Sequence, residues 1–157
     1  ALNYQIWIPH VFSVAKASSF GMTLEASFAG IAKGSAAIEG ESVGFDVKLP
    51  DGGYLMILDY EPGGDVNVIY PYEASETKAL PVNSKIALHD LMRVEAPFGR
   101  DSVHIVALSS SSELYRALPS NTQFQHDSDF AQKLVVMLSD KNVSKASVAM
   151  QIITAAR

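Results

Sequence analysis

Histidine and aspartate are the first residues in this sequence whose types suggest chemistry. The four histidines are His10, His89, His104 and His126. Two of them directly precede an aspartate, Asp90 or Asp127, a dipeptide found in metal-dependent HD-type phosphohydrolases. Such an enzyme needs further histidine and aspartate ligands on helices, whereas His89 falls at the end of a predicted strand. No two histidines have helical or zinc-finger spacing, so we expect no metal ion and no cofactor.

A run of four serines at residues 109–112 offers nucleophiles for a hydrolase. Such an enzyme would combine one serine with His104 or His126 and with Asp101 or Asp127. The chain has no Gly-x-Ser-x-Gly elbow, and serines that follow a strand more often form a turn and cap a helix. His104 also alternates with its neighbours in a predicted strand, which places it on a solvated face. Hydrolysis is therefore only a minor alternative.

Two glycine pairs lie beside acidic residues, in residues 51–53 and 62–65. Acidic side chains repel phosphate, and no Gly-Lys-Ser or Gly-Lys-Thr follows, which argues against a phosphate-binding loop. Asp59, Glu61 and Asp65 offer oxygen atoms for a calcium ion near the second pair. Calcium loops usually collect more carboxylates than this, so the pattern favours a hairpin turn over a calcium site.

Tyrosines gather around this second glycine pair. They are Tyr54, Tyr60, Tyr70 and Tyr72. Amphipathic aromatic side chains are enriched at binding surfaces, so these four are the candidate binding residues. The alternative is that their rings pack in the core with the hydroxyl groups at its rim.

Strand signals dominate the first 110 residues. Apolar and polar residues alternate in residues 22–29 and 41–49, which predicts half-buried strands. Residues 54–58 and 66–70 are almost continuously apolar and flank a Pro-Gly-Gly-Asp turn, which predicts a hairpin in the centre of a sheet. Further strands are expected at residues 4–14, 85–88, 103–108 and 143–152, with loops at residues 30–40 and 73–83.

Helical spacing appears only near the C-terminus. Residues 111–118 predict a short helix capped by a serine, and residues 129–141 predict a longer one. The apolar stripe of the longer helix consists of Phe130, Leu134, Met137 and Leu138. Such a stripe must be buried, so we expect this helix to pack on the sheet. The predicted fold class is mainly β: an antiparallel β-sandwich, immunoglobulin-like in architecture, with one or two helices packed on it.

The composition limits the possible partners. The chain has 157 residues, of which 48% are hydrophobic and 18% charged, enough for a single domain over residues 1–157. The net charge of −5, with scattered Lys and Arg, argues against nucleic acid and against an anionic membrane surface. No apolar run is long enough to cross a bilayer.

The sequence leaves the cellular location open. It has no cysteine, which suits the periplasm or cell envelope and the cytoplasm alike. Ala1 is not a natural start, so we expect a fragment or a processed part of a longer protein.

A series of short motifs runs through the middle of the chain. They are Glu-Gly-Glu-Ser-Val at 39–43, Gly-Tyr-Leu-Met-Ile-Leu at 53–58, Gly-Asp-Val at 64–66, Val-Ile-Tyr-Pro at 68–71, the stretch 80–86, Ala-Pro-Phe-Gly-Arg-Asp at 96–101 and Ala-Leu-Ser-Ser at 107–110. In this order, residues 40–108 resemble a bacterial domain family of unknown function, DUF4384. The family usually has Asn where this chain has Tyr72, which puts any role of that Asn in doubt.

The resemblance implies an accessory role. Members often lie at the C-terminal end of longer bacterial proteins, including caspase-like peptidases and protein kinases, and no catalytic residue is assigned to the family. We therefore predict a non-catalytic protein-interaction or accessory module of a bacterial multidomain protein. Its partner would be another protein or another domain of the same parent chain, bound at the rim of residues 60–72. The alternative is a small-ligand or glycan-binding module that uses the same tyrosines.

Overall fold

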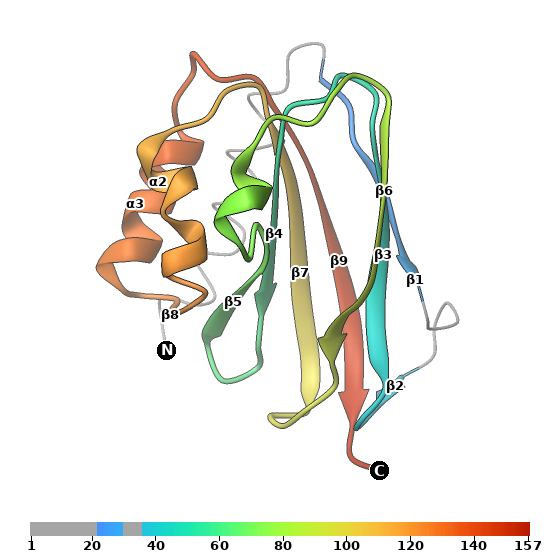
Figure 1. The fold of residues 1–157 in the computed structure, drawn as a ribbon. Coiled ribbons are helices and arrows are strands. Elements are labelled where there is room, and N and C mark those ends of the chain that lie inside the picture. The colour runs from blue at the N-terminus through green and yellow to red at the C-terminus, as the bar shows by residue number, and fades with distance from the viewer. Residues whose placement is uncertain (1–21, 30–35) are drawn as a thin grey trace.

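The chain forms a β-sandwich with a layer of helices on one outer face (Figure 1). The computed structural model describes residues 22–29 and 36–157. The small sheet contains, in spatial order, β1 (Glu25–Ala29), β3 (Ser42–Leu49) and β6 (Ser84–Arg93). The large sheet contains β2 (Ala37–Ile38), β9 (Lys145–Ala155), β7 (Gly99–Leu108), β4 (Tyr54–Tyr60), β5 (Asp65–Tyr70) and β8 (Gln123–Gln125).

The predicted sandwich is confirmed. All strand pairs are antiparallel except β2, which runs parallel to β9. The immunoglobulin-like architecture stays a prediction.

The alternation of β3 explains the core between the two sheets. Val43, Phe45, Val47 and Leu49 are buried on the inner face, as their two-residue period predicts. They pack in one cluster with Leu55 and Ile57 of β4. The other face of β4 is buried too, because the helices cover it, so its nearly continuous apolar run is confirmed as that of a central strand. In β5 only alternate residues are buried.

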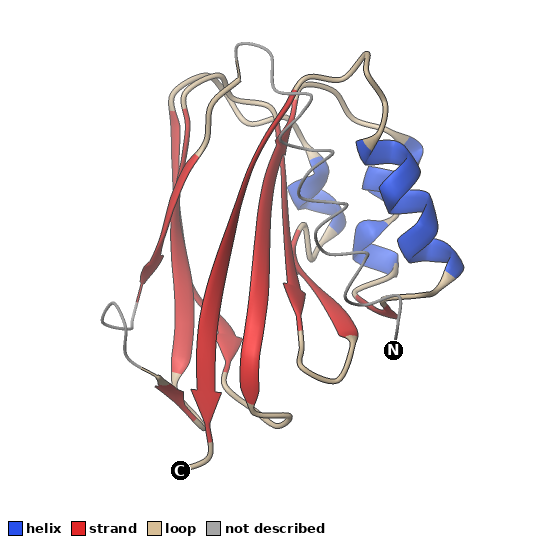
Figure 2. Ribbon diagram, turned by 180° about the vertical axis from the view of Figure 1, so that it is seen from behind, coloured by secondary structure: helices blue, strands red, loops and turns tan. Residues whose placement is uncertain are grey.

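The helical layer covers the other face of the large sheet (Figure 2). It consists of α2 (Glu113–Arg116), η2 (Leu118–Ser120) and α3 (Asp129–Leu138). Ser112 caps α2 by accepting a hydrogen bond from the Tyr115 backbone N–H at 3.1 Å, and Ser128 caps α3 in the same way. Leu134 and Leu138 of α3 are fully buried, so the predicted packing of this helix on the sheet is confirmed. It ends at Leu138, three residues earlier than predicted.

Several elements differ from the prediction. β6 and β7 begin earlier than expected, and β6 also continues through His89 to Arg93, where Asp90 adopts a positive φ of 58°. β2, β8 and η1 (Ala74–Thr77) fall in stretches expected to be loops or not assigned. The predicted strand at residues 4–14, and residues 30–35 of the predicted loop, lie outside the described residues. No helix in the described ranges is long and apolar enough to span a membrane.

Candidate functional site

The four candidate tyrosines do not share a surface. Tyr60 has an exposed fraction of 0% and Tyr70 of 7%, so both belong to the core. Tyr54 is partly buried, and its ring meets that of Tyr115 edge-on with centroids 5.6 Å apart. Tyr72 is 59% exposed. The expectation of an accessible rim at Tyr60 is therefore wrong, because β4 is buried on both faces, and the alternative of core packing describes Tyr60 and Tyr70.

Tyr72 lies between two adjoining hollows at an open edge of the sandwich. Their volumes are about 590 Å³ and 580 Å³. The residues that line both are Asn67, Ile69, Tyr72, Leu91 and Gln123. We call the two together the Tyr72 hollow. The topology explains its position, since β6 is an edge strand of the small sheet while β5 and β8 end the large one.

The walls of the Tyr72 hollow are strongly acidic. The carboxylates of the first part are Glu73, Glu76 and Asp90, and those of the second part are Asp59, Glu61, Asp65, Glu95 and Asp101. Among the described residues that line it, Arg93 is the one basic side chain. A concave surface lined in this way produces a negative potential that attracts cations.

Hydrogen bonds hold several of these carboxylates in place. Glu76 accepts from the backbone N–H groups of Tyr72 at 2.9 Å and of Glu73 at 3.0 Å, which anchors the chain at the exposed tyrosine. Glu61 accepts from the side-chain amide of Asn67 at 2.6 Å. The rim of the hollow is therefore built from fixed side chains of β5, η1 and the turn between β4 and β5.

Two carboxyl groups, those of Asp59 and Asp101, form the inner wall. Asp59 of β4 lies opposite Val103 of β7, so Asp101, two residues further along, projects from the same face as Asp59. This is the inner face, because Leu55 and Ile57 precede Asp59 at two-residue steps and belong to the core between the sheets. The exposed fractions of Asp59 and Asp101 are 4% and 5%. We call them the Asp59–Asp101 pair.

The surroundings of the pair raise the pKa of both carboxyl groups. Burial raises the pKa of Asp59 well above its ordinary value, and the charge of Asp101 raises it further. Burial also raises the pKa of Asp101, against a smaller opposite effect from its hydrogen bond with Asp59. Because two neighbouring carboxylates repel each other, the pair keeps a proton to a higher pH than an exposed aspartate does. The pKa of Glu61 is also raised by burial, and its hydrogen bond with Asn67 opposes this.

Two residues of the hydrolase alternative, Asp101 and His104, lie on opposite faces of the large sheet, because they are three residues apart in β7. Burial lowers the pKa of His104 to about 4, and its ring packs against Tyr60 with centroids 4.7 Å apart. The serine run follows the C-terminal end of β7, and Ser112 caps α2.

The other histidines have structural surroundings. The Nδ1 atom of His126 lies 3.0 Å from the backbone oxygen of Gly64, which joins β8 to the hairpin turn. His89 pairs with Asp46 of β3 at 3.2 Å, and both are exposed. His10 lies outside the described residues.

The calcium alternative is only partly reflected in the structure. Asp59, Glu61 and Asp65 line the same part of the Tyr72 hollow. In residues 22–29 and 36–157, however, no three His, Asp or Glu side chains are arranged to hold a metal ion.

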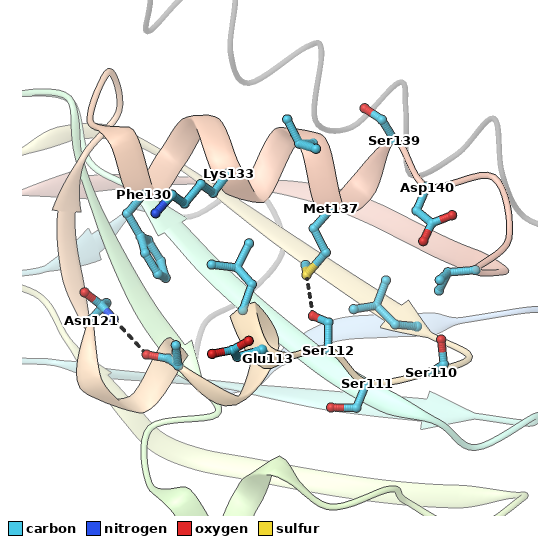
Figure 3. A pocket seen from close by; sticks show the side chains of 15 residues that line it. Ser110, Ser111, Ser112, Glu113, Asn121, Phe130, Lys133, Met137, Ser139 and Asp140 are labelled. Atoms are coloured by element: carbon cyan, nitrogen blue, oxygen red, sulfur yellow. Dashed lines mark hydrogen bonds between the residues drawn. The ribbon is translucent and has the colours of Figure 1, made fainter.

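A second groove runs between α2 and α3 (Figure 3). Its volume is about 1120 Å³, and Phe130, Met137 and the last three serines of the run, residues 110–112, lie along it. The Ser112 hydroxyl lies 3.2 Å from the Met137 sulfur across the groove. Phe130 and Met137 belong to the predicted apolar stripe of α3 but are only partly buried, because they line this groove.

Sequence reasoning assigned Asp59 only to a calcium turn and Asp101 only to a catalytic triad. The sequence did contain a signal for both residues. Each aspartate follows the two-residue period of the buried apolar residues of its strand, which places its carboxyl group on a buried face. Their proximity depends on the register of β4 against β7. Comparison of the chain with protein-family models, curated proteins and solved structures finds no match.

Proposed function

We propose that this domain is a non-catalytic interaction module that binds a basic segment of another protein, or of another domain in the same parent chain, in the Tyr72 hollow. The observation that carries the proposal is the charge of the hollow. Carboxylates line both of its parts, whereas Arg93 is the one basic residue among the described lining residues. Complementary charge of this kind speeds association and selects partners.

The centre of the hollow offers apolar contacts as well. Tyr72 is 59% exposed and Leu91 40%, and both line the two parts. The stem of a lysine or arginine packs well against such side chains, and its charged end interacts favourably with a tyrosine ring. The combination fits a lysine- or arginine-rich segment better than an acidic or purely apolar one.

The resemblance to DUF4384 supports an accessory role in a bacterial protein. It does not identify the partner. The glycan alternative has less support, because stacking on several tyrosines needs several exposed rings and both Tyr60 and Tyr70 are buried.

The test uses two labelled octapeptides, one with alternating lysine and serine and one with glutamate in place of lysine. We expect fluorescence anisotropy to show that the domain binds the lysine peptide, more weakly as salt increases, and does not bind the glutamate peptide. Tyr72→Ala should weaken binding about tenfold, the effect of losing one well-packed aromatic contact. Equal binding of both peptides by the unmodified domain would refute the proposal.

A pair of charge reversals separates the hollow from the net charge of the domain. Glu95 lines the hollow, whereas Glu25 lies on β1 and pairs loosely with Lys48 at 3.9 Å. Glu95→Lys should weaken binding of the lysine peptide, and Glu25→Lys should leave it nearly unchanged. If both weaken it equally, the contact surface is not the Tyr72 hollow.

A further inference from the structure

We propose that the Asp59–Asp101 pair is the anchor point of the hollow and binds one primary ammonium group, the Nζ of a lysine in the bound segment. This inference rests on the proposed function and names the group that the hollow selects. The pair lies at the inner wall, and Glu61 and Asp65 line the same part of the hollow.

The first argument is that no donor group of the described domain reaches the pair. Asp59 and Asp101 are more than nine-tenths buried, and apart from their hydrogen bond with each other the Oδ1 atom of each has no partner among the described residues. Buried polar atoms are nearly always paired, so two buried carboxyl groups that have only each other are unusual. Both side chains project from the inner face of the large sheet and line the hollow.

The second argument is that no cationic side chain in residues 22–29 and 36–157 forms an ion pair with Asp59 or Asp101. The ion pairs of the described residues join Lys48 to Glu25 and His89 to Asp46, and neither involves the hollow. Arg93 lines the hollow but is exposed. Among the described residues, no cation occupies the inner wall, which leaves it open to the cation of a ligand.

The third argument concerns the kind of cation. An ammonium group is compact and carries three donors that rotate freely, so it can donate to carboxyl groups on two different strands. A guanidinium is a flat, rigid fork that suits a single carboxylate from one side. A metal ion would need at least a third protein ligand, and the described residues offer no such group of three. Met92, Val94 and Pro97 also line this part of the hollow and suit an alkyl stem.

A nearby ammonium group favours the ionised form of both carboxyl groups, so its binding and the protonation of the pair oppose each other. The affinity should therefore rise with pH over the range in which the free pair loses its proton. The charged groups that face the pair are Glu61 at the end of β4, Asp65 of β5, Arg93 of β6 and Glu95 of the β6–β7 connection.

The probe is n-butylammonium chloride, with n-butanol as a neutral control of the same shape. We expect the amine, and not the alcohol, to move the ¹³C carboxyl resonances of Asp59 and Asp101 in the unmodified domain. Asp59→Asn and Asp101→Asn should weaken amine binding at least about tenfold, while Asp65→Asn at the rim should weaken it much less. The resonances of the unmodified domain test the inference even if a variant does not fold.

Three outcomes would overturn the inference. The amine could leave both carboxyl resonances in place, Asp59→Asn could bind it as the unmodified domain does, or calcium chloride could move the same resonances at lower concentration than the amine. If the lysine octapeptide then still binds in a Tyr72-dependent way, the anchor fails and the proposed function stands. If the amine moves the resonances but no lysine peptide binds, the proposed function fails, and with it the assignment of the ammonium to a partner's lysine.

Discussion

Substitution of Leu134 tests whether the helical layer is an integral part of the domain. Leu134 of α3 has an exposed fraction of 0% and packs in one cluster with Met56 and Leu58 of β4 and Tyr115 of α2. Leu134→Ala removes about three methylene equivalents, worth about 2.4 kcal/mol in lost burial. The cavity left behind brings the expected loss of unfolding free energy to about 3–5 kcal/mol.

The assay is urea denaturation followed by far-ultraviolet circular dichroism, with calorimetry as a second measurement. A loss of 3 kcal/mol lowers Tm by roughly 6–12 °C in a domain of this size. Val136 is a matched control on the same helix, because its side chain is 72% exposed. Val136→Ala should change the unfolding free energy by no more than about 0.5 kcal/mol.

The result that would refute this reasoning is a Leu134→Ala domain as stable as the Val136→Ala control. The helix α3 would then unfold separately from the sandwich, and its groove would become the better candidate for a contact surface. Removal of the chain after Ser120 would not be an equivalent test. It would also delete β9, which pairs with β7 along its whole length.

The remaining predictions concern charge and backbone. Asp59→Asn should raise the urea midpoint at pH 7.5 and raise it much less at pH 4. Above the ordinary pKa of 3.8 the folded state holds more protons than the unfolded state, so the stability of the unmodified domain falls as pH rises towards the raised pKa of Asp59. Equal gains at both pH values would contradict this prediction. Gly64→Ala should lower the unfolding free energy by about 1–3 kcal/mol, because the φ of Gly64 is +95° and a Cβ there would lie 2.7 Å from Nδ1 of His126. The control Gly63→Ala should leave the urea midpoint unchanged, since its Cβ would meet no atom nearer than 4.0 Å. Equal midpoints for the two variants would contradict this prediction. Lys145→Met should lower the unfolding free energy by about 1–3 kcal/mol, since the ammonium group of the buried Lys145 donates to two backbone carbonyls of the α3–β9 loop, each at 2.6 Å. An unchanged urea midpoint would show that these hydrogen bonds contribute nothing to stability.

The elements that could be predicted are those whose burial repeats within one segment. The period of two in β3 and the helical stripe of α3 each identify a face that must be covered, whatever covers it. The Pro-Gly-Gly-Asp turn could also be predicted locally. Gly64 has a positive φ, a conformation that glycine adopts without strain. Local information was sufficient in these cases.

Short and polar elements could not be predicted in the same way. β2 has two residues and β8 has three, and each is a strand only because a neighbour supplies its hydrogen bonds. β6 continues through His89 and Asp90, residues that read locally as a strand end. Pairing with β3 decides the length of this strand, and a single segment does not contain that information.

The candidate site shows the same division. Tyr72 could be identified because it stands next to the hairpin, although the same reasoning wrongly placed Tyr60 at the surface. The Asp59–Asp101 pair depends on the register between β4 and β7, which brings together residues far apart in the chain. Each aspartate had been assigned separately to a different chemistry, and only the sheet places both on one wall.

Stability and binding should respond in opposite directions at the Asp59–Asp101 pair, and this distinguishes a binding role from a structural one. Burial raises the pKa of both carboxyl groups, so their ionisation destabilises the free domain, and Asp101→Asn should increase its resistance to urea at neutral pH. The same variant should gain less stability than the unmodified domain when n-butylammonium is added, because a ligand stabilises only in proportion to its binding. If the Asp59–Asp101 pair only supported the fold, the results would be reversed. Asp101→Asn would be less stable than the unmodified domain, and n-butylammonium would stabilise neither protein.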